Sequence, residues 1–185
     1  MKKKVLFMVT ALLVAFTASA QLSVKGGLSL SNLLGEDVEG YSAKVGFYGG
    51  VGYDLEFAYG VALQTGVYAV SKGAKHDGKS VNGIYLQVPI HIAAKIDFTP
   101  GTHIVIHGGP FVAYGIAGNN NLWGSSKKTF GEGAAKPFDA GFGLGVGTEM
   151  GRFLIDFGVD MGLLQPDKDH KAKNMSAYLA LGFRF

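Results

Sequence analysis

The chain has 185 residues, with 29 glycines, five prolines and no cysteine, so neither a disulfide nor a cysteine-linked lipid anchor can form. It carries 17 Lys and Arg against 14 Asp and Glu, but Lys2, Lys3 and Lys4 account for the whole excess. The remainder has no net charge, which argues against the basic surface of a nucleic-acid-binding protein.

The first 20 residues have the three parts of a secretory signal peptide. The basic residues at 2–4 are followed by an apolar stretch over 5–16 and by the small residues Ala18-Ser19-Ala20. The apolar stretch is shorter than the roughly 20 residues of a membrane-spanning helix. We therefore expect residues 1–20 to be a cleaved signal peptide and residues 21–185 to form one exported domain.

Beyond residue 20, apolar side chains recur at every second position, as in a β-strand with two different faces. The clearest run is Ile84 to Phe98, in which every even position is apolar. No apolar run in this part is long enough for a membrane helix, so a membrane location requires a barrel. The expected strands lie at about 22–30, 44–57, 61–70, 84–98, 102–116, 138–150, 152–163 and 175–185.

The connections between these strands alternate in length. The long ones are expected at 31–43, 71–83, 117–137 and 164–174, and the tight turns at 58–60, 99–101 and 151. Outer-membrane barrels alternate in this way, with long outer loops and short periplasmic turns, and an even strand number returns both termini to the periplasm. The sequence thus predicts an all-β fold, an eight-stranded antiparallel up-and-down transmembrane β-barrel. Its last strand, which ends at Phe185, should pair with its first.

The polar face of the strands suits the interior of such a barrel, which is only wide enough for side chains. The apolar face should then meet lipid, and glycines of strand 138–150 should leave room for long lumenal side chains. The predicted lumen charge network comprises Lys25, Lys44, Asp54, Glu56, Lys95, Asp97, Asp139, Glu149, Arg152, Asp156, Asp160 and Arg184. Aromatic residues at the periplasmic strand ends predict an interfacial girdle of Phe57, Tyr59, Phe98, Phe153 and Phe185.

Several short motifs also occur in order along the chain. They are Val24-Lys25-Gly26-Gly27-Leu28-Ser29-Leu30-Ser31-Asn32, Tyr85-Leu86-Gln87-Val88-Pro89, Gly108-Gly109-Pro110-Phe111-Val112-Ala113-Tyr114, Asp139-Ala140-Gly141-Phe142-Gly143-Leu144-Gly145-Val146-Gly147 and Phe183-Arg184-Phe185. With them the chain resembles the small outer-membrane β-barrel proteins called porin-family or PorT-like in Gram-negative bacteria. The resemblance implies location in the outer membrane and insertion by the barrel-assembly machinery, and it implies no catalytic activity.

The residues offer little support for an enzyme or a metal centre. His91 and His107 should lie roughly opposite each other on the lumen face, with His103 near Lys95 or Asp97. These imidazoles could bind a divalent metal, but no carboxylate-plus-His ligand spacing accompanies them, so hydrogen-bonding roles are favoured and no metal or cofactor is expected.

Two motifs that would suggest catalysis or nucleotide binding also lack support. Ser23 and Ser29 have no motif that would make either a nucleophile. The alternating glycines over 141–147 are not followed by a helix, which argues against dinucleotide binding.

Function is then expected in the loops, where basic residues could contact lipopolysaccharide phosphates. The candidates are Lys72, Lys75, Lys79, Trp123, Lys127, Lys128, Lys168, Lys171 and Lys173. We expect a non-enzymatic barrel with a largely plugged lumen and a structural or surface-interaction role. A narrow porin or transporter for small solutes is the alternative, and a component of a secretion or surface-assembly system is a third. The expected partners are outer-membrane lipids and lipopolysaccharide; the sequence identifies no protein partner beyond the assembly machinery.

Overall fold

The computed structural model describes residues 20–35, 42–76, 79–120, 127–130, 136–164 and 172–185. Within them the chain forms eight long strands and one strand of two residues. The strands are β1 (Ala20–Gly35), β2 (Ser42–Ala58), β3 (Val61–His76), β4 (Lys79–Thr99), β5 (Thr102–Asn120), β6 (Lys127–Lys128), β7 (Phe138–Met150), β8 (Phe153–Gly162) and β9 (Ala172–Arg184). No helix in these residues is both long and apolar enough to cross a membrane.

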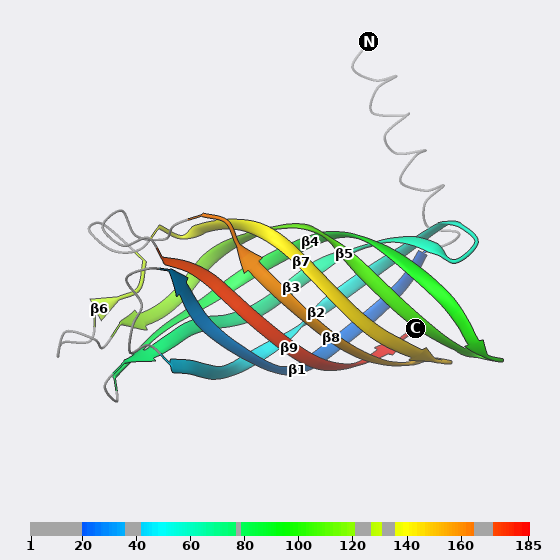
Figure 1. The fold of residues 1–185 in the computed structure, drawn as a ribbon, viewed down its shortest axis with the longest axis horizontal. Coiled ribbons are helices and arrows are strands. Elements are labelled where there is room, and N and C mark those ends of the chain that lie inside the picture. The colour runs from blue at the N-terminus through cyan, green and yellow to red at the C-terminus, as the bar shows by residue number, and fades with distance from the viewer. Residues whose placement is uncertain (1–19, 36–41, 77–78, 121–126, 131–135, 165–171) are drawn as a thin grey trace, which may run out of the picture.

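The eight long strands close into an antiparallel barrel (Figure 1). β1 pairs with β2 on one side and with β9 on the other, and β4 pairs with both β3 and β5. The Phe185 amide donates to the Leu22 carbonyl at 2.9 Å, so the predicted pairing of the first and last strands is confirmed. The predicted all-β, eight-stranded fold is therefore confirmed, and each long strand has two neighbours.

Three tight turns lie together at one end of the barrel, at the right of Figure 1, which we call the turn side. Gly60, Gly101 and Gly151 occupy these turns with φ between 59° and 78°. This left-handed conformation is strained for residues that carry a Cβ atom, which explains glycine at all three positions. The opposite end is the loop side.

The link predicted over 71–83 is wrong, because β3 continues to His76 and β4 begins at Lys79. Pairing continues from Ser71 with Ile84 out to His76 with Lys79. The polar residues of this segment look like a loop in the sequence, yet Lys72 and Ala74 continue the inward face of Tyr68 and Val70. The loop-side connection between β3 and β4 is therefore short, and the strict alternation of long and short links fails there.

Other differences are small. β1 and β5 extend beyond their predicted ends, β8 begins one residue later than expected, and β6 was not predicted. Most of the predicted signal peptide, 1–19, lies outside the described residues, and cleavage after Ala20 remains a prediction.

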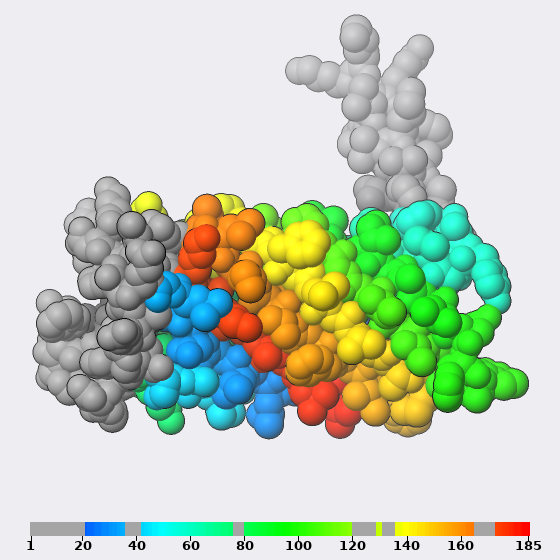
Figure 2. Space-filling model, viewed as in Figure 1, coloured from blue at the N-terminus to red at the C-terminus, as the bar shows by residue number. Residues whose placement is uncertain are grey.

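The long strands form a continuous outer wall in the space-filling view (Figure 2). Many large apolar side chains are exposed on this wall. On β7, for example, Phe142, Leu144 and Val146 are exposed, whereas Gly141, Gly143 and Gly145 between them face inward and are buried. The same alternation continues on β8 and β9. Leu144, for example, is 62% exposed. In water a wall of such side chains would be an unfavourable apolar surface, whereas in lipid it is not.

We expect Leu144→Arg to lower the unfolding free energy in lipid vesicles by about 2–4 kcal/mol, the cost of a charge near the bilayer midplane. Met150→Arg, on the same strand and face but at the turn side, should cost about 0–1 kcal/mol. Urea titration of both variants measures the difference. Equal, small effects would show that this face does not lie in hydrocarbon.

Candidate functional site in the barrel lumen

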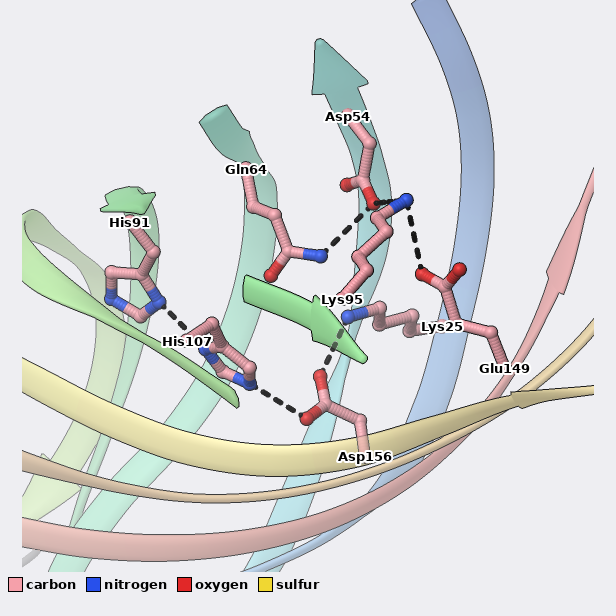
Figure 3. A network of polar contacts seen from close by, with 8 residues as sticks. All are labelled: Lys25, Asp54, Gln64, His91, Lys95, His107, Glu149 and Asp156. Atoms are coloured by element: carbon pink, nitrogen blue, oxygen red, sulfur yellow. Dashed lines mark hydrogen bonds and ion pairs between the residues drawn. The ribbon is translucent and has the colours of Figure 1, made fainter. Parts of the chain in front are cut away.

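The turn-side half of the lumen contains a continuous series of ion pairs. Arg184 pairs with Glu149, whose other oxygen lies 3.3 Å from the Lys95 ammonium. Lys95 also lies 3.5 Å from Asp54, which accepts a 2.9 Å hydrogen bond from Gln64. These side chains come from β9, β7, β4, β2 and β3, so the layer connects five strands across the interior. Figure 3 shows all of them except Arg184.

A second chain of contacts crosses the middle of the lumen (Figure 3). The Lys25 ammonium lies 2.6 Å from Asp156 Oδ2, and Asp156 Oδ1 lies 2.9 Å from His107 Nε2. His107 Nδ1 is in turn 3.0 Å from His91 Nδ1, and the two rings stack with centroids 5.2 Å apart. The structure thus brings together the two histidines that the sequence places on facing strands.

The order of donors in this chain follows from the carboxylate. Ionised Asp156 can only accept, so His107 donates from Nε2, and in a neutral imidazole its Nδ1 then carries the lone pair. His91 then donates from Nδ1, which leaves its buried Nε2 as an acceptor without a hydrogen-bond partner in the described structure. With both imidazoles neutral, the N–H group of each histidine in this series of hydrogen bonds therefore points toward Asp156.

The inward glycines of β7 make room for these side chains. A Cβ on Gly143 would lie 2.4 Å from Asp160 Oδ1 and 2.9 Å from His91 Nε2, and one on Gly145 would lie 2.4 Å from His107 Nε2. A Cβ on Gly141 would meet the Phe111 ring at 2.6 Å. The alternating glycines thus match the bulky lumenal residues of neighbouring strands, as the sequence suggests.

Aromatic rings fill the space beside the histidines. Tyr48 stacks between Tyr68, with centroids 4.9 Å apart, and Tyr178, at 4.2 Å. All three are buried. Asp160 lies near this stack and accepts a 2.7 Å hydrogen bond from Gln87.

The loop-side part of the lumen contains a third polar layer around Lys72. The prediction that Lys72 is a surface-loop residue is wrong, because its side chain points inward and is only 2% exposed. Its ammonium lies 3.5 Å from Asp139, which also accepts a 3.1 Å hydrogen bond from Asn174. The same ammonium lies over the rings of Phe111, at 4.5 Å, and Tyr85, at 5.3 Å.

Most residues of the predicted charge network do lie in the lumen. Those that face inward and make ion pairs or hydrogen bonds there are Lys25, Asp54, Lys95, Asp139, Glu149, Asp156, Asp160 and Arg184. Lys44 is half-buried and donates to Asn82 at 2.6 Å, and Glu56 is half-buried near the turn side.

Two members of that network are exposed at the turn-side rim instead. Arg152 lies in the tight turn before β8, so the inward direction of the strand does not extend to it. Asp97 contacts His103 at 3.0 Å and accepts a 2.5 Å hydrogen bond from the Tyr59 hydroxyl, which raises the pKa of Tyr59. Asp97 and Arg152 are therefore not part of the buried network.

The lumen polar residues that the sequence analysis missed are neutral or lie beyond the predicted strand ends. Gln64, Gln87 and Asn174 each bind a buried carboxylate. Their position on the inward face is the one signal that could have identified them. Ser29, which was considered as a nucleophile, donates to the carbonyls of Ser71 and Phe47.

The described lumen leaves little free space. Two cavities of about 20 Å³ lie beside Lys25, Asp54 and Asp156, each enough for about one water molecule. Among the described residues, no group of three His, Asp or Glu side chains is arranged to hold a metal ion.

The predicted surface residues are only partly covered by the structure. Phe57, Tyr59, Phe98, Phe153 and Phe185 are all exposed, at the turn-side ends of their strands or beside them. Lys75 and Lys173 are exposed near the loop side. Trp123, Lys168 and Lys171, together with the side chains of Lys79, Lys127 and Lys128, lie outside the described residues.

A closed antiparallel barrel with an apolar outer wall and a charged, filled interior is the architecture of a small outer-membrane protein. The sequence profile of the outer membrane protein beta-barrel domain family matches residues 15–165, so the chain belongs to this family and is an outer-membrane protein.

Several solved structures are similar to this chain at low sequence identity. Neisserial surface protein A is 12% identical, with 89% of this chain and 97% of that chain covered and a TM-score of 0.53. Ail, the attachment invasion locus protein of Yersinia pestis, is 15% identical, with 90% and 99% covered and a TM-score of 0.49. OprG from Pseudomonas aeruginosa is 10% identical, with 90% and 96% covered and a TM-score of 0.47. No curated protein sequence matches the chain.

We expect Gly145→Ala to lower the unfolding free energy by about 1–3 kcal/mol, because the added methyl displaces His107 from Asp156. In a His107→Ala background the same substitution should cost at least about 1 kcal/mol less. Gly26→Ala is the matched control, since no atom lies within 4 Å of the added carbon and its effect should be small. Urea titration of the unsubstituted protein, Gly145→Ala, His107→Ala and the double variant provides the double-mutant cycle. Additive losses of unfolding free energy would contradict the steric coupling.

Proposed function

We propose that this protein is a non-enzymatic outer-membrane barrel whose lumen is closed and whose role is structural or depends on surface contacts. The observation that carries the proposal is the filling of the interior. Three polar layers and a tyrosine stack cross the lumen, and the cavities beside the middle layer have the size of single water molecules.

The charges of these layers favour a structural role for the interior. Each ion pair joins strands that are distant in the sequence, for example Lys25 on β1 with Asp156 on β8. Removing one partner of a buried pair leaves an uncompensated charge, at a cost of about 3–5 kcal/mol. Paired charges therefore resist rearrangement into an open channel.

A narrow porin or transporter is the second candidate, and one observation favours it. Polar side chains line the lumen from Arg184 and Glu149 at the turn side to Lys72 and Asp139 near the loop side. In this candidate, separation of the paired side chains would connect these layers to water.

Surface contacts are proposed at the loop side. Exposed Lys75 and Lys173 provide cations that suit the phosphates of lipopolysaccharide. The PorT-like relationship and a place in a secretion or surface-assembly system are finer proposals, which pull-down from intact envelopes would test.

The closed-lumen proposal predicts that the purified protein, reconstituted in planar bilayers, produces no stable single-channel steps. Heat-modifiable gel mobility of the same preparation serves as the control that the barrel is folded and inserted. Reproducible conductance steps from a folded preparation would overturn the closed lumen and favour the narrow pore.

A further inference from the structure

Among the residues that the structure describes, one aromatic residue at the loop-side mouth of the lumen does not belong to the barrel wall. Phe130 follows β6, between β5 and β7 in the chain, and is half-buried. Its ring packs edge-on against Tyr85 with centroids 5.3 Å apart, and it adjoins the buried cluster of Tyr85, Phe111 and Ala113. Residues 127–130 thus lie at the mouth, where Phe130 contacts residues that face inward.

Two glycines of the wall create the seat for this ring. A Cβ on Gly115 would lie 2.3 Å from the Phe130 ring, and one on Gly83 would lie 3.0 Å from it. Both glycines are buried on the inward faces of β5 and β4. Any larger residue at Gly115 would meet the ring, so the wall and Phe130 are complementary in shape.

The residue before Phe130 holds the segment in place. The Thr129 amide donates to the Gly118 carbonyl at 3.0 Å, and the Thr129 hydroxyl donates to the Asn82 carbonyl at 2.7 Å. Thr129 is buried, and β6 pairs with β5 through Lys128 with Asn119. These bonds attach the segment to both strands that carry the glycine seat.

The Lys72 layer lies on the same cluster of rings. Lys72 contacts Phe111 and Tyr85, the same rings against which Phe130 packs, and Asp139 beside it is also buried. Asp139 Oδ1 has no hydrogen-bond partner in the described structure. A buried carboxylate oxygen without a partner is costly, so admission of a water molecule to this layer would be favourable once the mouth is uncovered.

From these contacts we propose that Phe130 is a stopper that closes the loop-side mouth of the lumen. Thr129 is its anchor, and the Lys72 and Asp139 layer is the site that it shields from water. The inference rests on the closed lumen proposed above and names the residues that close one end. The middle and turn-side layers consist of ion pairs between wall strands. Removal of the Phe130 ring should therefore give water access to the lumen only as far as the Lys72 layer.

The chain lacks cysteine, so single introduced thiols report water access without a background signal. Ala113→Cys places a thiol under Phe130, and Ala93→Cys places one in the buried cluster of Ala62, Ala93 and Val105. The full chain, folded in lipid vesicles, is treated with a small water-soluble thiol reagent, and the labelling rate is measured by mass spectrometry.

We expect the Ala113→Cys thiol to be protected when Phe130 is present and to react about two- to tenfold faster with Phe130→Ala, as expected from the loss of an aromatic contact. Ala93→Cys should stay protected in both backgrounds. Phe138→Ala is the matched control, because it removes an exposed phenylalanine from the outer face of β7 near the same end. It should leave the Ala113→Cys rate unchanged.

Thr129→Val provides a second route that leaves the ring intact and should raise the Ala113→Cys rate by about threefold or more through loss of one hydrogen bond. An unchanged rate in both Phe130→Ala and Thr129→Val, or a thiol at 113 that already reacts freely with Phe130 present, would overturn the stopper. Neither result depends on conductance, so a failed stopper is distinguishable from a failed closed lumen. If Phe130→Ala does not fold, judged by heat-modifiable mobility, the Thr129→Val rate decides the question.

Discussion

Hydrocarbon offers a peptide group no hydrogen-bond partner, and this constraint determines the architecture of the chain from end to end. The structure satisfies it by pairing β1 with β9 and β4 with β5, so that none of the eight long strands is left with a free edge. The last residue takes part, since the Phe185 amide donates to Leu22. Closure with eight strands then sets the size of the interior, which admits side chains but no wide channel.

A lumen of that size must be filled by side chains that fit one another in volume and charge. Transverse rows of the wall show how this is done. Gly143 on β7 pairs with Asp160 on β8, and both Asp160 and His91 extend over the space that the glycine leaves. One row along, Gly145 leaves space for His107. The charged side chains that fill these spaces lie in a low dielectric. Each therefore requires an opposite charge nearby, as Lys25 has in Asp156, as well as a matching volume.

Alternation along the sequence predicts the strands well, because lipid on one side and a polar lumen on the other impose opposite preferences on successive residues. It fails beyond Val70, where Lys72 is inward and polar, so the pattern resembles a solvated loop. The closeness of His91 and His107 was predictable because a tight turn at Pro100-Gly101 sets the register of β4 and β5, although His107 pairs with Ala93 and His91 is the next inward residue along β4. Lys25 and Asp156 are 131 residues apart, and their contact depends on closure and stagger, which alternation does not encode. The seat of Phe130 depends on the path of a long connection and was equally inaccessible.

Closure is the claim on which the lumen, its ion pairs and the stopper all depend, and amide hydrogen exchange in lipid bilayers tests it most directly. In a closed barrel successive amides of β1 and of β9 donate alternately to the two neighbouring strands, so all of them should exchange as slowly as those of β3 and β8. Rapid exchange confined to β1 and β9, as in the exposed edges of an open sheet, would contradict closure.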